Sequence, residues 1–100
     1  MKNRIKDILV FKENYNARSA EITATDLCSI KDPTIKAAVG IWVATGEQKN
    51  AKIGNLSSKQ LMENHGMKYP ASLIFLDWYI EKPQEAISCL EQKGGFFNDV

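Results

Sequence analysis

Residues 69–83, YPASLIFLDWYIEKP, decide the fold, because they form an almost uninterrupted apolar run between two prolines. Apolar side chains also alternate from Ile74 to Ile80, so a strand with one wholly apolar face is the alternative interpretation. We favour a helix, since one proline lies in its first turn, the second stops it, and the length suits three turns. A helix this apolar predicts a mainly α fold.

The two sides of this predicted helix differ in character. Its inner face is predicted to hold Leu73, Leu76, Tyr79 and Ile80. On the other side Ile74 and Trp78 lie one turn apart, and the carboxylates Asp77 and Glu81 lie beside them. An aromatic anchor with a polar rim is typical of the centre of a protein interface. The alternative is that a neighbouring helix, over residues 84–93, covers this side.

Further helix starts lie on both sides of this stretch. Asp32 before Pro33 predicts a capped helix that Gly46 ends. Ser57 and Gln60 form a capping box, with Leu56 and Leu61 as its apolar staple. The same pattern predicts a third cap at Thr23, closed by Asp26 and stapled by Ile22 and Leu27. A last helix is predicted to start at Pro83, with Ala86, Ile87 and Leu90 inside and a stop at Gly94-Gly95.

These starts predict a small single domain over residues 1–100, a mainly α bundle of five or six helices built from helix-turn-helix hairpins. Segments 22–28 and 56–62 align at an offset of 34 residues. Either an internal duplication or the common sequence requirements of helix-turn-helix hairpins would explain this similarity. Residues 3–13 have apolar side chains at helical spacing, and a short strand over residues 8–11 is the alternative. A short β-hairpin is compatible with residues 8–22 or 41–53, and residues 45–55 form the best candidate for a loop or hairpin arm.

Composition sets limits on the protein's class. The formal net charge is +1, so no overall field indicates nucleic acid or an anionic membrane. We find no signal-peptide pattern at the start and no apolar run long enough to cross a bilayer, which predicts a cytoplasmic protein without a membrane partner. Cys28 and Cys89 each have apolar neighbours, so we expect both thiols to be free and buried.

Catalytic and metal-binding patterns are weak. His65 is the only histidine, and Glu63 is two residues away, where a helix would point the two side chains in divergent directions. The sequence contains no CxxC pair and no glycine-rich phosphate loop. It also contains no motif that would identify a catalytic nucleophile together with a general base. We therefore expect no enzyme activity, no cofactor and no metal.

Nucleic-acid binding is the second hypothesis. Thr34, Ile35, Val39, Trp42 and Gly46 have the spacing of the second helix of winged-helix domains. Residues 1–54 thus resemble that family, with 21–27 as the strand and first helix and 45–54 as the wing. Residues 1–69 carry 11 basic and 7 acidic side chains. The lysines that would contact nucleic acid are Lys36, Lys49, Lys52, Lys59 and Lys68.

The side chains on the exposed side of this second helix argue against sequence-specific recognition of DNA. It offers Ala37, Gly40, Ile41 and Ala44, whereas a major-groove reader needs Arg, Lys, Asn or Gln there. The leading hypothesis is therefore a small non-catalytic protein-binding module: an inhibitor, adaptor or accessory subunit that binds another protein or a second copy of itself as a homodimer. Its predicted site comprises Ile74, Asp77, Trp78, Glu81, Phe96 and Phe97; the two phenylalanines either pack into a core groove or bind the partner.

Overall fold

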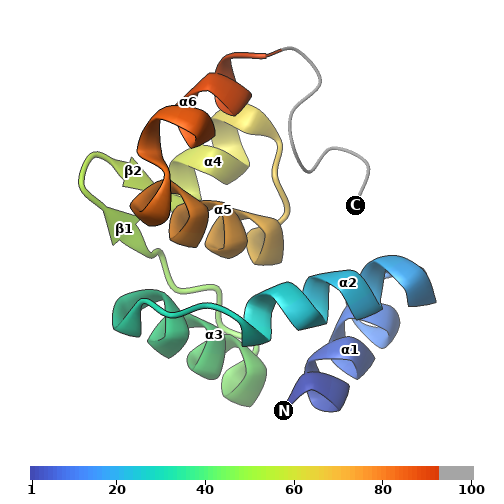
Figure 1. The fold of residues 1–100 in the computed structure, drawn as a ribbon. Coiled ribbons are helices and arrows are strands. Elements are labelled where there is room, and N and C mark those ends of the chain that lie inside the picture. The colour runs from blue at the N-terminus through green and yellow to red at the C-terminus, as the bar shows by residue number, and fades with distance from the viewer. Residues whose placement is uncertain (93–100) are drawn as a thin grey trace.

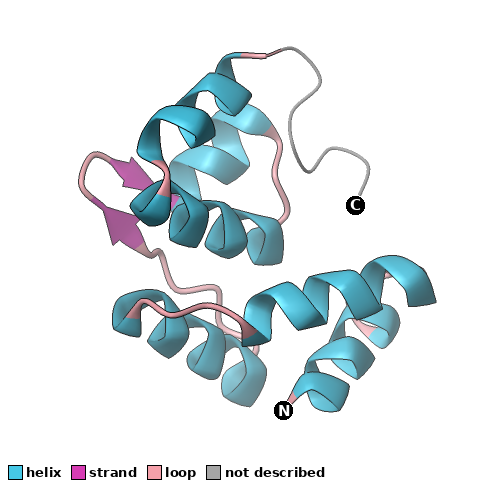
Figure 2. Cartoon of the chain, viewed as in Figure 1, coloured by secondary structure: helices cyan, strands magenta, loops and turns pink. Residues whose placement is uncertain are grey.

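Six helices and one two-stranded hairpin make up residues 1–92, the part of the chain that the computed structural model describes (Figures 1 and 2). In chain order the elements are α1 (Lys2–Phe11), α2 (Ala17–Cys28), α3 (Pro33–Thr45), β1 (Lys52–Ile53), β2 (Leu56–Ser57), α4 (Ser58–His65), α5 (Tyr69–Glu81) and α6 (Pro83–Glu91). The prediction of a mainly α bundle is confirmed.

Helix α5 is the central element. Figure 1 shows α1, α2 and α3 in one half of the molecule, and α4, α5, α6 and the hairpin in the other. Contacts from α5 reach α2 and α3 in the first half as well as α4 and α6 in its own. Phe75 and Leu76 are fully buried in a hydrophobic cluster to which all six helices contribute. The helix, rather than the alternative strand, is confirmed for residues 72–80.

Two of the predicted caps are present. The Asp32 carboxylate accepts a hydrogen bond from the backbone N–H of Ile35 at 3.1 Å, so it caps α3. Gly46 ends that helix in the left-handed region at φ 78°, where glycine carries no Cβ penalty. Ser57 and Gln60 form the complete capping box at the start of α4. Side chains that satisfy orphan N–H groups therefore set these boundaries.

The predicted cap at Thr23 is wrong. Helix α2 begins at Ala17, and the Asn16 side chain caps it by accepting the Ser19 N–H at 2.8 Å. Thr23 is buried in the helix interior, and Ile22, its expected staple, is 54% exposed. The earlier start lets Ala20 and Ala24 pack in the core. Burial of this small-residue face explains why the chain uses Asn16 instead.

The earlier start of α2 also bears on the strand expected within residues 21–27 and on the 34-residue sequence similarity. Residues 21–27 all lie within α2, so the strand that the winged-helix resemblance implies there is wrong. The hairpin lies later, with Lys52 opposite Ser57 and Ile53 opposite Leu56. The segments of α2 and α4 that align in sequence differ in structure, because Thr23 is internal and Ser57 is a cap. Residues 8–11, for which a strand was the alternative, belong to α1.

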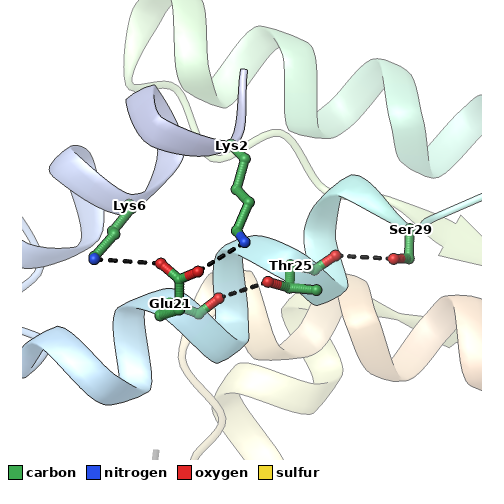
Figure 3. A network of polar contacts seen from close by, with 5 residues as sticks. All are labelled: Lys2, Lys6, Glu21, Thr25 and Ser29. Carbon is green, nitrogen blue, oxygen red and sulfur yellow. Dashed lines mark hydrogen bonds and ion pairs between the residues drawn. The ribbon is translucent and has the colours of Figure 1, made fainter.

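A polar network joins α1 to α2 (Figure 3). The Glu21 carboxylate lies between the ammonium groups of Lys2 and Lys6, at 2.7 and 3.2 Å. Hydrogen bonds from Lys2 and then Lys6 lower the pKa of Glu21. Further along α2, the Thr25 hydroxyl donates to the Glu21 carbonyl, and the Ser29 hydroxyl donates to the Thr25 carbonyl, both at 2.9 Å.

The ends of α5 and α6 are more exposed than the apolar pattern predicts. Tyr79 is half-buried and Ile80 is 41% exposed, since α5 extends past the core in its last turn. On α6, Ala86 is buried, but Ile87 is 36% exposed, so its assignment to the inner face is wrong. Helix α6 ends at Glu91, and the predicted stop at residues 94–95 lies outside the described residues.

The cysteines differ from the expectation in burial but not in pairing. Both thiols are free. Cys28 is exposed, so its predicted burial is wrong, and Cys89 is half-buried on α6. Cys28 is the last residue of α2 and lies at the edge of an open, mostly apolar cavity of about 230 Å³ that Met1 and Ile5 also line. Its apolar neighbours therefore form a groove that remains open to solvent.

Candidate functional site

The four described residues of the predicted protein-binding site lie together. Ile74, Asp77, Trp78 and Glu81 follow one side of α5 at helical spacing and line an open cavity of about 380 Å³. Phe96 and Phe97, the other two predicted site residues, lie outside the described residues. The opposite wall of the cavity comes from the end of α2 and the connection to α3. We call this cavity the α2–α5 cleft; its lining residues are Asp26, Ser29, Lys31, Ile74, Asp77, Trp78 and Glu81.

The apolar part of the cleft belongs to the edge of the core. Ile74 and Trp78 are half-buried and pack against the hydrophobic cluster. The Trp78 ring meets the buried Phe75 ring edge to face, with centroids 5.6 Å apart and planes at 87°. This geometry is favourable for aromatic pairs and fixes the indole in place. Trp78 thus reaches the cleft as a supported side chain that remains partly open to solvent.

Asp77 holds the two walls of the cleft together. Its Oδ1 atom accepts long hydrogen bonds from the backbone N–H groups of Lys31 and Asp32, each at 3.4 Å. These residues lie in the connection between α2 and α3, and Asp32 is itself the N-cap of α3. A carboxylate near a helix N-terminus is also favoured by the helix dipole. Asp77 is therefore a positioning residue that links α5 to the α2–α3 connection.

Glu81 and Lys31 form the rim. The Lys31 ammonium lies 3.8 Å from the Glu81 carboxylate, and the two side chains are 83% and 52% exposed. An ion pair this exposed contributes about 0–1 kcal/mol to stability. The lysine is the only basic residue among the cleft's lining residues, which include three carboxylates, so the cleft carries a net charge of −2.

Asp26 is the third carboxylate of the cleft. It lies one helical turn before Ser29, the C-cap residue of α2. Within residues 1–92 its carboxylate has neither an ion pair nor a hydrogen bond, and partial burial raises the pKa of this group. The sequence pattern marked Asp26 as part of a capping box, whereas the structure places it on the cleft. Ser29 and Lys31 carried no sequence signal, because they meet α5 only through the tertiary fold.

The five lysines of the nucleic-acid hypothesis are all exposed. None of them forms an ion pair with an acidic side chain within residues 1–92. The Lys68 ammonium lies 4.4 Å from the centre of the Tyr15 ring, and Lys49 contributes its backbone carbonyl, which accepts from the Tyr69 hydroxyl at 2.7 Å. Lys36 lies on α3 beside the cavity that Cys28 lines, so the five side chains come from several elements.

Other kinds of site have little support in the described part of the chain. Residues 1–92 contain no group of three or more His, Cys, Asp and Glu side chains placed to hold a metal ion. His65 is exposed at the last position of α4. None of the described helices has the length and apolar character needed to cross a membrane.

Comparison of the chain with models of protein families, with curated proteins and with solved structures finds no match. The functional interpretation therefore depends on the α2–α5 cleft itself.

Proposed function

We propose that the protein is a small, non-catalytic protein-binding module and that the α2–α5 cleft is its binding face. The observation that supports this most directly is the combination of Ile74 and Trp78, half-buried in an open cavity, with carboxylates around them. Interfaces concentrate binding free energy in aromatic anchors that lie in a pocket with a polar rim. A partner side chain that enters the cleft would cover the exposed part of the indole.

The position of α6 bears on the competing structural explanation, in which this side of α5 is simply core. In that alternative, a helix over residues 84–93 covers it. The cleft is instead lined by α5, the end of α2 and the following connection, with no α6 residue among its lining residues. A separate cavity on α6 is lined by Tyr79, Pro83 and Ile87. The α2 wall leaves space beside Trp78, which supports binding over burial alone.

Crosslinking combined with stability measurements tests the proposal. A photoreactive amino acid at Ser29, on the cleft wall, should crosslink a protein partner in lysate of the source cells. The same amino acid at Glu63 on α4 serves as the control. Trp78→Ala should abolish the Ser29 crosslink yet cost clearly less stability than the roughly 3–5 kcal/mol of a core Trp→Ala change. Equal crosslinking from both positions, or a stability loss in the core range, would refute the proposal.

Nucleic-acid binding is the second candidate, supported by the exposed lysines without acidic partners. The exposed positions of α3 still offer few groups that read bases, with Lys36 the main exception. We expect no duplex complex tighter than about micromolar at physiological salt, which is the range of non-specific binding. Replacing Lys49, Lys52 and Lys59 together by Ala should then change little. A nanomolar, sequence-selective and salt-sensitive complex that this triple change abolishes would favour the second candidate.

A further inference from the structure

We infer that the α2–α5 cleft binds a partner segment through a cationic side chain, arginine or lysine, placed between Asp26, Glu81 and the face of Trp78. This inference rests on the proposed function and adds the chemistry of the partner. It commits to a basic peptide segment of another protein as the occupant. Three features of the cleft support it: its negative charge, the weakness of its internal ion pair and the presence of the indole.

Charge complementarity is the first argument. The cleft's three carboxylates face a single ammonium, that of Lys31. Asp77 already has two backbone N–H partners, whereas Asp26 has no partner within residues 1–92. Asp26 is exposed on the cleft wall, so its carboxylate is accessible to a cation that enters the cleft. An incoming cation would give Asp26 its missing counter-charge.

The Lys31–Glu81 pair is the second argument. The Lys31 ammonium already lies at the rim, beside the Glu81 carboxylate. The contact is long, at 3.8 Å, and the Lys31 side chain is 83% exposed, so little holds it in place. A partner's guanidinium could displace it and bind Glu81 through two parallel hydrogen bonds, which an ammonium cannot do.

The lining of the cleft suits an organic cation and not a metal ion. Within residues 1–92 the carboxylates of the cleft do not form a group placed to hold a metal ion. Trp78, on the other hand, lines the same cavity, and indole is the best aromatic partner for a cation. Arginine also stacks on aromatic faces along its planar group. A side chain with an apolar stem and a cationic head therefore matches both Ile74 and the carboxylates.

Nuclear magnetic resonance with defined peptides tests the inference. The uniformly ¹⁵N-labelled full chain is titrated with three pools of random octapeptides that differ only in a fixed central residue: arginine, glutamate or leucine. We expect the arginine pool alone to shift the backbone amide signals of residues 26–31 and 74–81 in a saturable way. Raising the salt concentration should weaken this effect.

The outcomes distinguish the inference from the proposed function. If the leucine pool shifts the cleft signals as strongly as the arginine pool, the cationic occupant is wrong while a protein-binding cleft is supported. Shifts caused by the glutamate pool would refute the charge argument. If no pool affects the cleft, the inference is wrong, and the Ser29 crosslink then decides the proposed function by itself.

Variants in which carboxylates are replaced by neutral amides test the inference independently. The double change Asp26→Asn and Glu81→Gln removes two carboxylate charges and leaves Asp77 to hold the α2–α3 connection. It should weaken binding of the arginine pool about fivefold or more, as expected for the loss of exposed charge pairs. Glu63→Gln, on α4, is the matched control and should leave binding unchanged. Unaltered affinity in the double variant, with the amide spectrum of a folded protein, would refute the inference.

Discussion

Two buried tyrosines should respond in opposite directions when their hydroxyl groups are removed. Tyr15 is 5% exposed, and its hydroxyl has no hydrogen-bond partner within residues 1–92. Tyr69 is 2% exposed, and its hydroxyl donates to the Lys49 carbonyl at 2.7 Å. An unsatisfied buried donor costs about 1–3 kcal/mol, whereas an ordinary hydrogen bond contributes about 0.5–1.5 kcal/mol. Each Tyr→Phe change removes a hydroxyl group and leaves the ring in place. The two changes therefore compare an unsatisfied hydroxyl with a hydrogen-bonded one while side-chain shape stays nearly constant.

We expect Tyr15→Phe to raise the free energy of unfolding by about 1 kcal/mol, because the phenyl ring keeps its packing and its contact with Lys68. Tyr69→Phe should lower it by about 1 kcal/mol. For a domain of this size, each change corresponds to about 4–8 °C in the thermal midpoint. Urea unfolding, followed by the fluorescence of Trp42 and Trp78, gives both values, provided that the m-value is unchanged.

The same variants should differ from the parent at alkaline pH. Burial, and then the charge of Glu13, raises the pKa of Tyr15 to about 12, and burial followed by Glu47 does the same for Tyr69. Because the folded pKa lies above the unfolded value of about 10, the stability contribution is complete below pH 10 and is lost as the pH rises toward 12. Each Tyr→Phe change should reduce this loss. A Tyr15→Phe variant that loses 1 kcal/mol or more at neutral pH would refute the reasoning.

Three further outcomes follow from local contacts. A thiol reagent should label Cys28 in the native protein faster than Cys89, which is half-buried; equal slow rates without denaturant would contradict the exposed position of Cys28. Asp32→Ala should cost about 1 kcal/mol of stability in urea unfolding, because α3 loses its cap, and Asp32→Asn should restore most of it. Glu21 has a lowered pKa, so its contribution is present above its unfolded pKa and lost as the pH falls through the folded value. Glu21→Gln should therefore flatten the acid side of the stability profile, and an unchanged acid limb in pH-dependent melting would show that the two lysine partners contribute nothing.

Local chemistry explains which helix boundaries the sequence predicts. At Asp32 and Ser57, the capping side chain and the backbone N–H that donates to it lie three residues apart, so the decisive hydrogen bond is encoded locally. Thr23 has the same pattern, but Asn16 offers a competing cap about two helical turns earlier. The choice between them depends on packing Ala20 and Ala24 in the core, which is a tertiary effect that no local pattern contains.

One wall of the candidate site is predictable from local sequence, whereas the other depends on the tertiary fold. Helical spacing within one segment places Ile74, Asp77, Trp78 and Glu81 on one side of α5, so the sequence predicts that these four lie together. The facing wall comes from residues more than 40 positions earlier, and Asp26 had been assigned to a cap. The exposure of Cys28 is a similar case, because apolar neighbours in sequence predict burial only if another element covers them.

The central position of α5 has a consequence for the order in which the protein can fold during synthesis. A nascent chain folds as its segments become available, beginning with the N-terminal part. The first two helices can pack together early, since α1 and α2 are neighbours in sequence and in contact. Ile35 and Trp42 of α3 belong to a core that includes Leu73 and Phe75 of α5, so apolar side chains of the first half remain incompletely covered until residue 81 has been made. During that interval the growing chain presents the kind of surface that chaperones bind.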